Sequence, residues 1–160
     1  MAVEDTFNGA KAGLTFMNAY SNTVAQAIGM EQALALETTM CETLGAAQGK
    51  MIKEQAGIEE LDANAATQML SNLIKESFGI LSEVVVDSPQ RVLIKVGRCP
   101  VYESAQALGM DTEAIEASCR SSSIMFMDAL AKQLNPDLSY QLDKFRSAAD
   151  DYCEEAVVLG

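Results

Sequence analysis

The chain has 160 residues, a formal net charge of −12 and no histidine. The charge argues against nucleic acid and anionic membrane surfaces as partners, because both are themselves negative. The lack of histidine excludes the commonest general base and metal ligand, together with the Ser-His and Cys-His catalytic pairs. Hydrophobic residues make up 49% and charged residues 21%, a composition typical of a globular domain with its own core.

The first half of the chain, residues 1–80, is expected to be helical. Apolar residues recur at helical spacing over residues 6–28 and over residues 30–56. A third helical pattern follows Asp62 or Asn64, either of which can cap its N-terminus. These three helices form the N-terminal part of one domain that we expect to span residues 1–160.

The first two helical patterns are apolar on more than one side, which favours self-association. We expect a homodimer with two-fold symmetry through these N-terminal helices. Small residues that would allow close packing are Gly9, Gly13, Gly45 and Gly49. Cys41 lies within the apolar stripe of the second pattern, so we interpret it as a core residue.

The period changes in the second part, residues 81–160, which carries the other three cysteines. Residues 83–86 and 91–96 are rich in β-branched residues and flank a polar turn, a pattern typical of a β-hairpin. Pro100 lacks the amide that a strand needs, so the second strand must stop before it. Cys99 therefore lies at a strand end, where a thiol can face a pocket.

The remaining residues predict two helices and a second hairpin. Pro100 suits the first turn of a short helix, and a longer helix running to about Leu134 carries Cys119. Residues 138–142 alternate as a half-buried strand, and Cys153 opens the closing strand. The predicted fold class is α+β, with N-terminal helices and a four-stranded, mainly antiparallel sheet of two hairpins covered by helices.

The order of these elements resembles a known family. A hairpin ends in Arg98-Cys99-Pro100, a helix carries Cys119, and the return strand of the last hairpin opens with Cys153. This pattern, over roughly residues 81–159, is similar to the L-2-amino-thiazoline-4-carboxylic acid hydrolase-like family and, more distantly, to 4-vinyl-reductase-type small-molecule-binding domains. The resemblance implies a small-molecule-binding domain. If the named activity carries over, Cys99 is the leading nucleophile for hydrolysis of a C–N or C–S bond.

A cysteine nucleophile needs a group that stabilises its thiolate, because a free thiol with a pKa of ~8.5 is mostly protonated at neutral pH. Without histidine, the candidates are three arginines and the N-terminus of the short helix that begins near Pro100. The helix end is the most economical choice, since its unpaired amides favour negative charge. If Cys99 is the nucleophile, we therefore expect its pKa to be lowered and its alkylation near neutral pH to be faster than that of Cys41. The arginines in question are Arg98, Arg120 and Arg146.

Other residues near the cysteines are candidates for binding a substrate. Arg120 and Arg146 could each hold a carboxylate through a bidentate contact. Tyr102 and Glu103 follow Cys99 on the short helix and could face the same pocket. The acidic residues around Cys153 are interpreted as a solvated loop, with the alternative that one supplies a metal ligand or a general base. They are Asp150, Asp151, Glu154 and Glu155.

Two other uses of the thiols stay open. Cys99, Cys119 and Cys153 could together hold zinc, copper(I) or an iron–sulfur cluster, although no CxxC pair pre-forms such a site. A Cys-Pro step could also ligate haem. The alternative to a hydrolase is then a non-catalytic ligand- or metal-binding or sensing module, and a third possibility is a dimerisation module without a ligand.

The sequence also predicts a location. The acidic N-terminal residues 1–13 lack the apolar stretch of a signal peptide, and no run approaches the ~20 apolar residues of a spanning helix. We therefore expect a cytoplasmic protein whose four cysteines are reduced.

Overall fold

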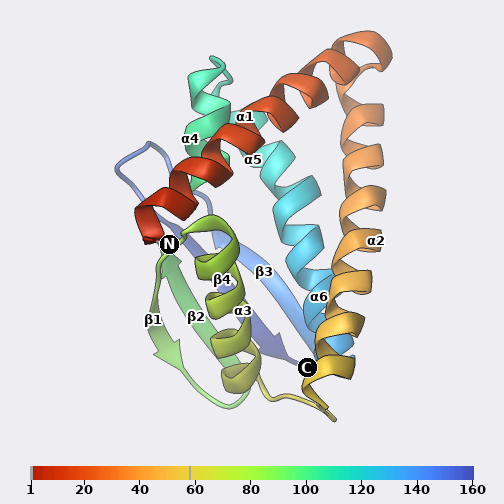
Figure 1. Ribbon diagram of the computed structural model, residues 1–160, viewed down its shortest axis with the longest axis vertical. Helices are drawn as coiled ribbons and strands as arrows, with labels where there is room; N and C mark the ends of the chain where they lie inside the picture. Colours follow the sequence, from red (N-terminus) through yellow and green to blue (C-terminus); the bar gives the residue numbers. More distant parts are fainter. Residues whose placement is uncertain (1, 58) are drawn as a thin grey trace.

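The computed structural model describes residues 2–57 and 59–160, and it has helices around a four-stranded sheet (Figure 1). Three N-terminal helices precede the first strand: α1 (Val3–Ile28), α2 (Met30–Ala56) and α3 (Ala63–Phe78). The rest of the chain forms β1 (Ser82–Asp87), β2 (Arg91–Val96), α4 (Pro100–Ala107), α5 (Thr112–Cys119), the π-helical turn η1 (Arg120–Ile124), α6 (Met125–Leu134), β3 (Leu138–Lys144) and β4 (Cys153–Leu159). The predicted α+β class with a four-stranded antiparallel sheet is confirmed.

The two predicted hairpins join into one sheet through their inner strands. The strand order is β1-β2-β4-β3, and every neighbouring pair is antiparallel. In the pairing of β2 with β4, Val96 lies opposite Cys153. Because side chains alternate along a strand, this register brings the end of β2 and the start of β4 together on one face. The register therefore places Cys153 beside the segment that leads to Cys99.

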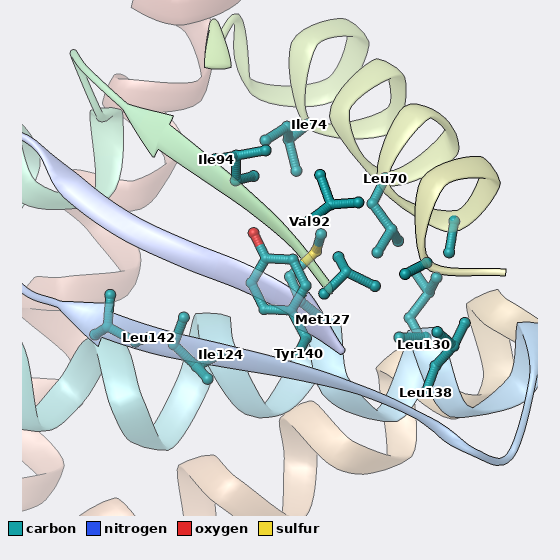
Figure 2. Close-up of a cluster of buried hydrophobic side chains, with 14 of the residues drawn as sticks. Leu70, Ile74, Val92, Ile94, Ile124, Met127, Leu130, Leu138, Tyr140 and Leu142 are labelled. Carbon is teal, nitrogen blue, oxygen red and sulfur yellow. The ribbon is translucent and has the colours of Figure 1, made fainter. Parts of the chain in front are cut away.

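The main core lies between one face of the sheet and the helices that cover it. Figure 2 shows Leu70 and Ile74 of α3 and Leu130 of α6 pointing toward strand side chains such as Val92 and Tyr140. Leu70, Val92 and Leu130 are almost completely buried. A second, smaller cluster joins α4 to α5 and consists of Tyr102, Ala105 and Ile115. The candidate site described below lies where these two clusters meet.

Helix α2 packs closely against α6, and glycine makes the approach possible. A Cβ atom on Gly45 would lie 2.2 Å from the carbonyl oxygen of Phe126, and one on Gly49 would lie 2.7 Å from that of Leu130. The close packing expected of these two glycines is therefore made within the chain. The other apolar side of α2 is exposed, which leaves Leu36, Met40, Leu44 and Met51 open to solvent.

One long helix was expected up to about Leu134, but it contains a π-helical turn at Arg120–Ile124. The turn contains the serine run of residues 121–123. Serine is a weak helix former whose hydroxyl competes for backbone carbonyls, and Ser122 Oγ donates to the carbonyl of Ser118 at 2.7 Å. The turn directly follows Cys119, which lines the candidate site described below.

Helix α1 crosses beside α4, as Figure 1 shows. Asn18 Nδ2 donates to Ser104 Oγ at 2.9 Å, and Lys11 pairs with Glu103 at 2.9 Å. The helical N-terminal part is thereby tied to the element that follows Cys99. None of the helices in residues 2–57 and 59–160 is long and apolar enough to cross a membrane.

Candidate functional site

A small cavity lies at the end of the sheet between β4, α4 and α5. Its volume is about 20 Å³. A buried water needs roughly 10–15 Å³, so the cavity can hold a water molecule, and a larger ligand requires its walls to move apart. Its lining residues are Val96, Cys99, Val101, Tyr102, Ile115, Cys119, Phe145, Arg146, Cys153 and Glu155. We call this site the three-cysteine cavity.

Three of the four cysteines converge on this cavity from separate elements. Cys99 precedes α4, Cys119 ends α5, and Cys153 opens β4. Cys41 is buried on α2 and is not among the lining residues. The four thiols are free. Cys99 at a strand end, Cys119 on a helix and Cys153 at a strand start therefore line the same cavity.

Cys99 occupies the N-cap position of α4, and Pro100 begins the helix. The backbone amides of Tyr102 and Val101 point toward its sulfur and favour the thiolate, as does the nearby Arg146. Burial outweighs these effects and raises the pKa of the Cys99 thiol to about 11. The predicted lowering of this pKa is wrong, because the sequence reveals the helix end but not the depth at which the sulfur is buried. Cys99 is therefore protonated at neutral pH in this state.

Cys119 is held in the protonated form for a similar reason. Burial raises the pKa of its thiol well above the usual value, and the negative charge of Glu155 raises it further. Arg120 opposes this shift only weakly. Two of the three cavity thiols are thus neutral at physiological pH.

Arg146 is the most unusual residue of the cavity, because it is a charged side chain with only 1% of its surface exposed. Its Nη2 donates to the carbonyls of Val96 (3.2 Å) and Gly97, and its Nη1 donates to that of Asp151 (3.4 Å). Its Nε donates to Cys153 Sγ at 3.4 Å. Within the described part of the chain no carboxylate lies at ion-pair distance from its guanidinium. A buried cation without an anionic partner is costly, which marks Arg146 as a candidate anion-binding group.

Glu155 also lines the cavity, although its place among the acidic residues 150–155 suggested a solvated loop. It receives a hydrogen bond from the buried hydroxyl of Tyr140 to its Oε2. Burial raises the pKa of the Glu155 carboxyl, while the Tyr140 hydrogen bond and the Arg146 charge oppose the shift. The signal that could have found it is the period of two, which puts Glu155 on the same face of β4 as Cys153.

The other predicted binding residues divide between the cavity and the surface. Tyr102 is buried and lines the cavity, with the Arg146 guanidinium 5.1 Å from its ring centre. Glu103 is not a lining residue and instead pairs with Arg98 and Lys11, which hold the pKa of its carboxyl below the usual value. Arg98 therefore lies on the surface with Glu103, away from the cavity thiols.

Arg120 likewise lies outside the cavity and is exposed. It pairs with Glu116 at 2.7 Å, and its Nη1 donates to the carbonyl of Leu142 at 3.3 Å. Leu142 stands opposite Glu155, just before the register shift of β3. Arg120 thus connects the π-helical turn to the strand irregularity beside the cavity, a structural contact and not a contact with the cavity interior.

The arrangement of the thiols does not form a metal centre. Across residues 2–57 and 59–160, no three Cys, Asp or Glu side chains are placed to hold one metal ion. The positive charge of Arg146 beside Cys153 would also oppose a cation there. The geometry therefore gives no support to the zinc or iron–sulfur alternative at Cys99, Cys119 and Cys153.

Comparison with known proteins places the chain in a family. The model of the L-2-amino-thiazoline-4-carboxylic acid hydrolase family matches residues 10–155. The chain belongs to this family. The resemblance inferred from the cysteine-bearing elements is confirmed, and in this family member the match includes all three cavity cysteines. No curated protein sequence matches the chain.

Solved structures share the fold at low sequence identity. One is trafficking protein particle complex subunit 3 from Naegleria fowleri covalently bound to palmitic acid, with a TM-score of 0.59 and 13% identity. The match covers 94% of the present chain and 96% of the Naegleria subunit. Another is the phenol-responsive sensory domain of the transcription activator PoxR with phenol, with a TM-score of 0.63, 12% identity, and coverage of 91% and 74%. At these identities the likeness establishes the fold alone.

Proposed function

We propose that this chain binds a small molecule in the three-cysteine cavity and hydrolyses a C–N or C–S bond of that molecule through a cavity thiol. The observation that carries the proposal is the convergence of three thiols, a buried arginine and the Glu155 carboxyl on one cavity. Family membership supports the reaction type, since the family is named for a hydrolase. The phenol and palmitate complexes of proteins with this fold support the use of the fold for binding small molecules.

Arg146 is the proposed anchor for a carboxylate of the ligand. A bound carboxylate would give the buried guanidinium the anionic partner that it lacks. Tyr102 and Phe145 would form an apolar wall beside it, since their ring centres lie 6.0 Å apart at the cavity. Because the cavity is only about 20 Å³, binding must be accompanied by movement of its walls.

Cys99 is the nucleophile that the sequence favours, and the amides of α4 are the feature that supports it. Its thiol must first lose its proton, because its pKa is about 11. Glu155 could accept this proton, since burial raises the pKa of its carboxyl and makes it a stronger base than an exposed glutamate.

A non-catalytic binding or sensing module is the second candidate function. The raised pKa values of Cys99 and Cys119 favour it, because neutral thiols are weak nucleophiles. In that case the ligand would be held by Arg146 and the cavity walls without being changed.

Incubation with L-2-amino-thiazoline-4-carboxylic acid separates these functions. Mass spectrometry should detect a ring-opened product that has gained one water, and a thermal-shift assay should show stabilisation by the ligand. Loss of turnover in Cys99→Ser, but not in the matched control Cys41→Ser, would support Cys99 as the nucleophile. Stabilisation without product would favour the binding module, and the absence of both effects would refute the proposal for this compound.

Self-association through α1 and α2 is a further part of the proposal. Among the described residues, most of the exposed large hydrophobic side chains lie on these two helices, including Phe16, Tyr20 and Leu44. Light scattering should show a dimer that Leu44→Glu weakens, and a strict monomer at high concentration would contradict it. The cytoplasmic location stays a prediction from the sequence.

A further inference from the structure

We propose that Cys153, and not Cys99 or Cys119, is the reactive thiol of the three-cysteine cavity and that Arg146 activates it. Arg146 Nε donates to Cys153 Sγ at 3.4 Å, and no other cysteine receives a hydrogen bond from a charged side chain in the described residues. Both residues lie deep in the structure, with exposed fractions of 1% and 5%. Their contact is therefore shielded from solvent, where a charge strengthens a hydrogen bond most.

The charge balance around Arg146 is the physical reason for this assignment. Its other partners are the backbone carbonyls of Val96, Gly97 and Asp151, and all three are neutral. Arginine stays protonated in proteins, and within the described residues no carboxylate lies at ion-pair distance from this positive charge. Cys153 is the ionisable side chain to which it donates, and loss of the thiol proton would create a thiolate–guanidinium pair. Such a pair offsets the cost of burying the arginine charge.

The other charged groups near the pair do not replace Cys153 in this role. Glu155 lies two residues further along β4 and is bonded to the Tyr140 hydroxyl. The Asp151 carboxylate is bound by Lys144 Nζ (2.9 Å) and by the amide of Ser147 (2.9 Å). Cys99 and Cys119 also face the cavity, but burial raises the pKa of both thiols. Arg146 is thus the charged side chain in direct contact with the Cys153 sulfur, while Glu155 lies on the same face of β4 and is bonded to Tyr140.

This assignment makes Cys153, in place of the Cys99 that the sequence favours, the nucleophile of the proposed hydrolysis. The Cys153 sulfur forms a bond to the electrophilic carbon of the ligand, while the bond from that carbon to its nitrogen or sulfur leaving atom breaks. The leaving atom takes the bonding electron pair and the proton that Cys153 gives up. Water then replaces the Cys153 sulfur on the carbon, and the thiol regains a proton from that water.

The order in which the cysteines react with methyl methanethiosulfonate tests the inference without a ligand. The thiolate sulfur attacks the reagent, a new S–S bond forms, and methanesulfinate leaves. After brief labelling near pH 7.5, the protein is denatured, the remaining thiols are blocked with N-ethylmaleimide, and combined digestion after glutamate and after lysine separates the four cysteines. Cleavage at Lys132 or Lys144 divides Cys119 from Cys153. Cleavage at Glu103, Glu113 or Glu116 divides Cys99 from Cys119.

We expect Cys153 to be labelled at least about tenfold faster than Cys99 and Cys119, after each rate is divided by that of the denatured protein. All three thiols line one cavity, so its opening limits them alike. Cys153 is also more buried than the other two, which works against the expected order. Faster labelling of Cys99 or Cys119, or equal rates for all three, would overturn the inference.

A matched pair of variants tests the role of Arg146. Arg146→Met should slow labelling of Cys153 at least about tenfold, whereas Arg120→Met should leave the Cys153 rate unchanged. If Arg146→Met does not fold, Arg146→Lys replaces it. A smaller loss is then expected, because the ammonium keeps the positive charge and loses only the Nε contact. An unchanged Cys153 rate in a folded Arg146 variant would refute activation by Arg146. The catalytic role of Cys153 rests on the proposed function, but the order in which the cysteines are labelled does not. The reactivity of Cys153 and the proposed hydrolysis can therefore be refuted separately.

Discussion

Replacement of Gly45 by alanine tests the contact between α2 and α6. The new Cβ atom would lie 2.2 Å from the Phe126 carbonyl oxygen and 3.0 Å from its carbon, whereas ordinary contacts begin at 3.4 Å. Because the clash is with backbone, the two helices must move apart by about 1 Å. Overpacking costs about 1–3 kcal/mol, and a clash with backbone at this distance lies at the upper end, about 3 kcal/mol, while the better helix propensity of alanine returns only about 1 kcal/mol. We expect a net loss of about 2 kcal/mol in the free energy of unfolding.

Urea denaturation measures this loss directly, and Gly13→Ala is the matched control. With an m-value of about 2 kcal/mol/M, the midpoint of Gly45→Ala should fall by about 1 M. Gly13 lies within α1, and a Cβ atom added there would meet nothing within 4 Å, so its replacement should stabilise the protein by about 0.5–1 kcal/mol. Equal stability of the two variants would refute the close approach of α2 to α6.

Three further predictions concern the cavity. Burial raises the pKa of the Glu155 carboxyl, so the stability that this group contributes is complete below the pKa of the unfolded chain and is lost as the pH rises through the folded-state pKa. In urea denaturation, the stability of Glu155→Gln relative to the wild type should therefore increase as the pH rises from about 4, and a pH-independent difference would contradict this. Tyr140→Phe removes the hydroxyl donor to Glu155 and should destabilise the protein by about 1–3 kcal/mol at neutral pH. The loss should be smaller when Glu155→Gln is already present, whereas fully additive losses of stability in the double variant would argue against an interaction between Tyr140 and Glu155. Zinc should leave the labelling rates of Cys99, Cys119 and Cys153 unchanged because no metal-binding group forms among the described residues, and joint protection by zinc would revive the metal-site alternative.

The fold could be predicted well because its main signals are local. The β-branched residues Val92, Ile94 and Val96 identify β2, and Pro100 fixes its end and the start of α4. The same reasoning puts Cys153 at the start of β4. The organisation of residues 1–160 as one domain stays a prediction.

The features that were missed depend on tertiary structure. The pKa of Cys99 is set by burial, which no local pattern reports, and burial outweighs the helix end that the sequence does reveal. Glu155 stands in an acidic segment whose composition suggests solvent, and only its strand register turns it inward toward Tyr140. The contact of Arg146 with Cys153 joins residues on either side of a loop whose path the sequence does not specify.

The most direct test of the central claim is a calorimetric titration of L-2-amino-thiazoline-4-carboxylic acid into the wild type and into Cys119→Met. The larger methionine side chain should fill the cavity of about 20 Å³, while Cys41→Ser serves as a control outside it. If the ligand binds in the three-cysteine cavity, the wild type and the control will show saturable heat and folded Cys119→Met will show none. Equal heat in all three proteins, or no heat in the wild type, would contradict the account.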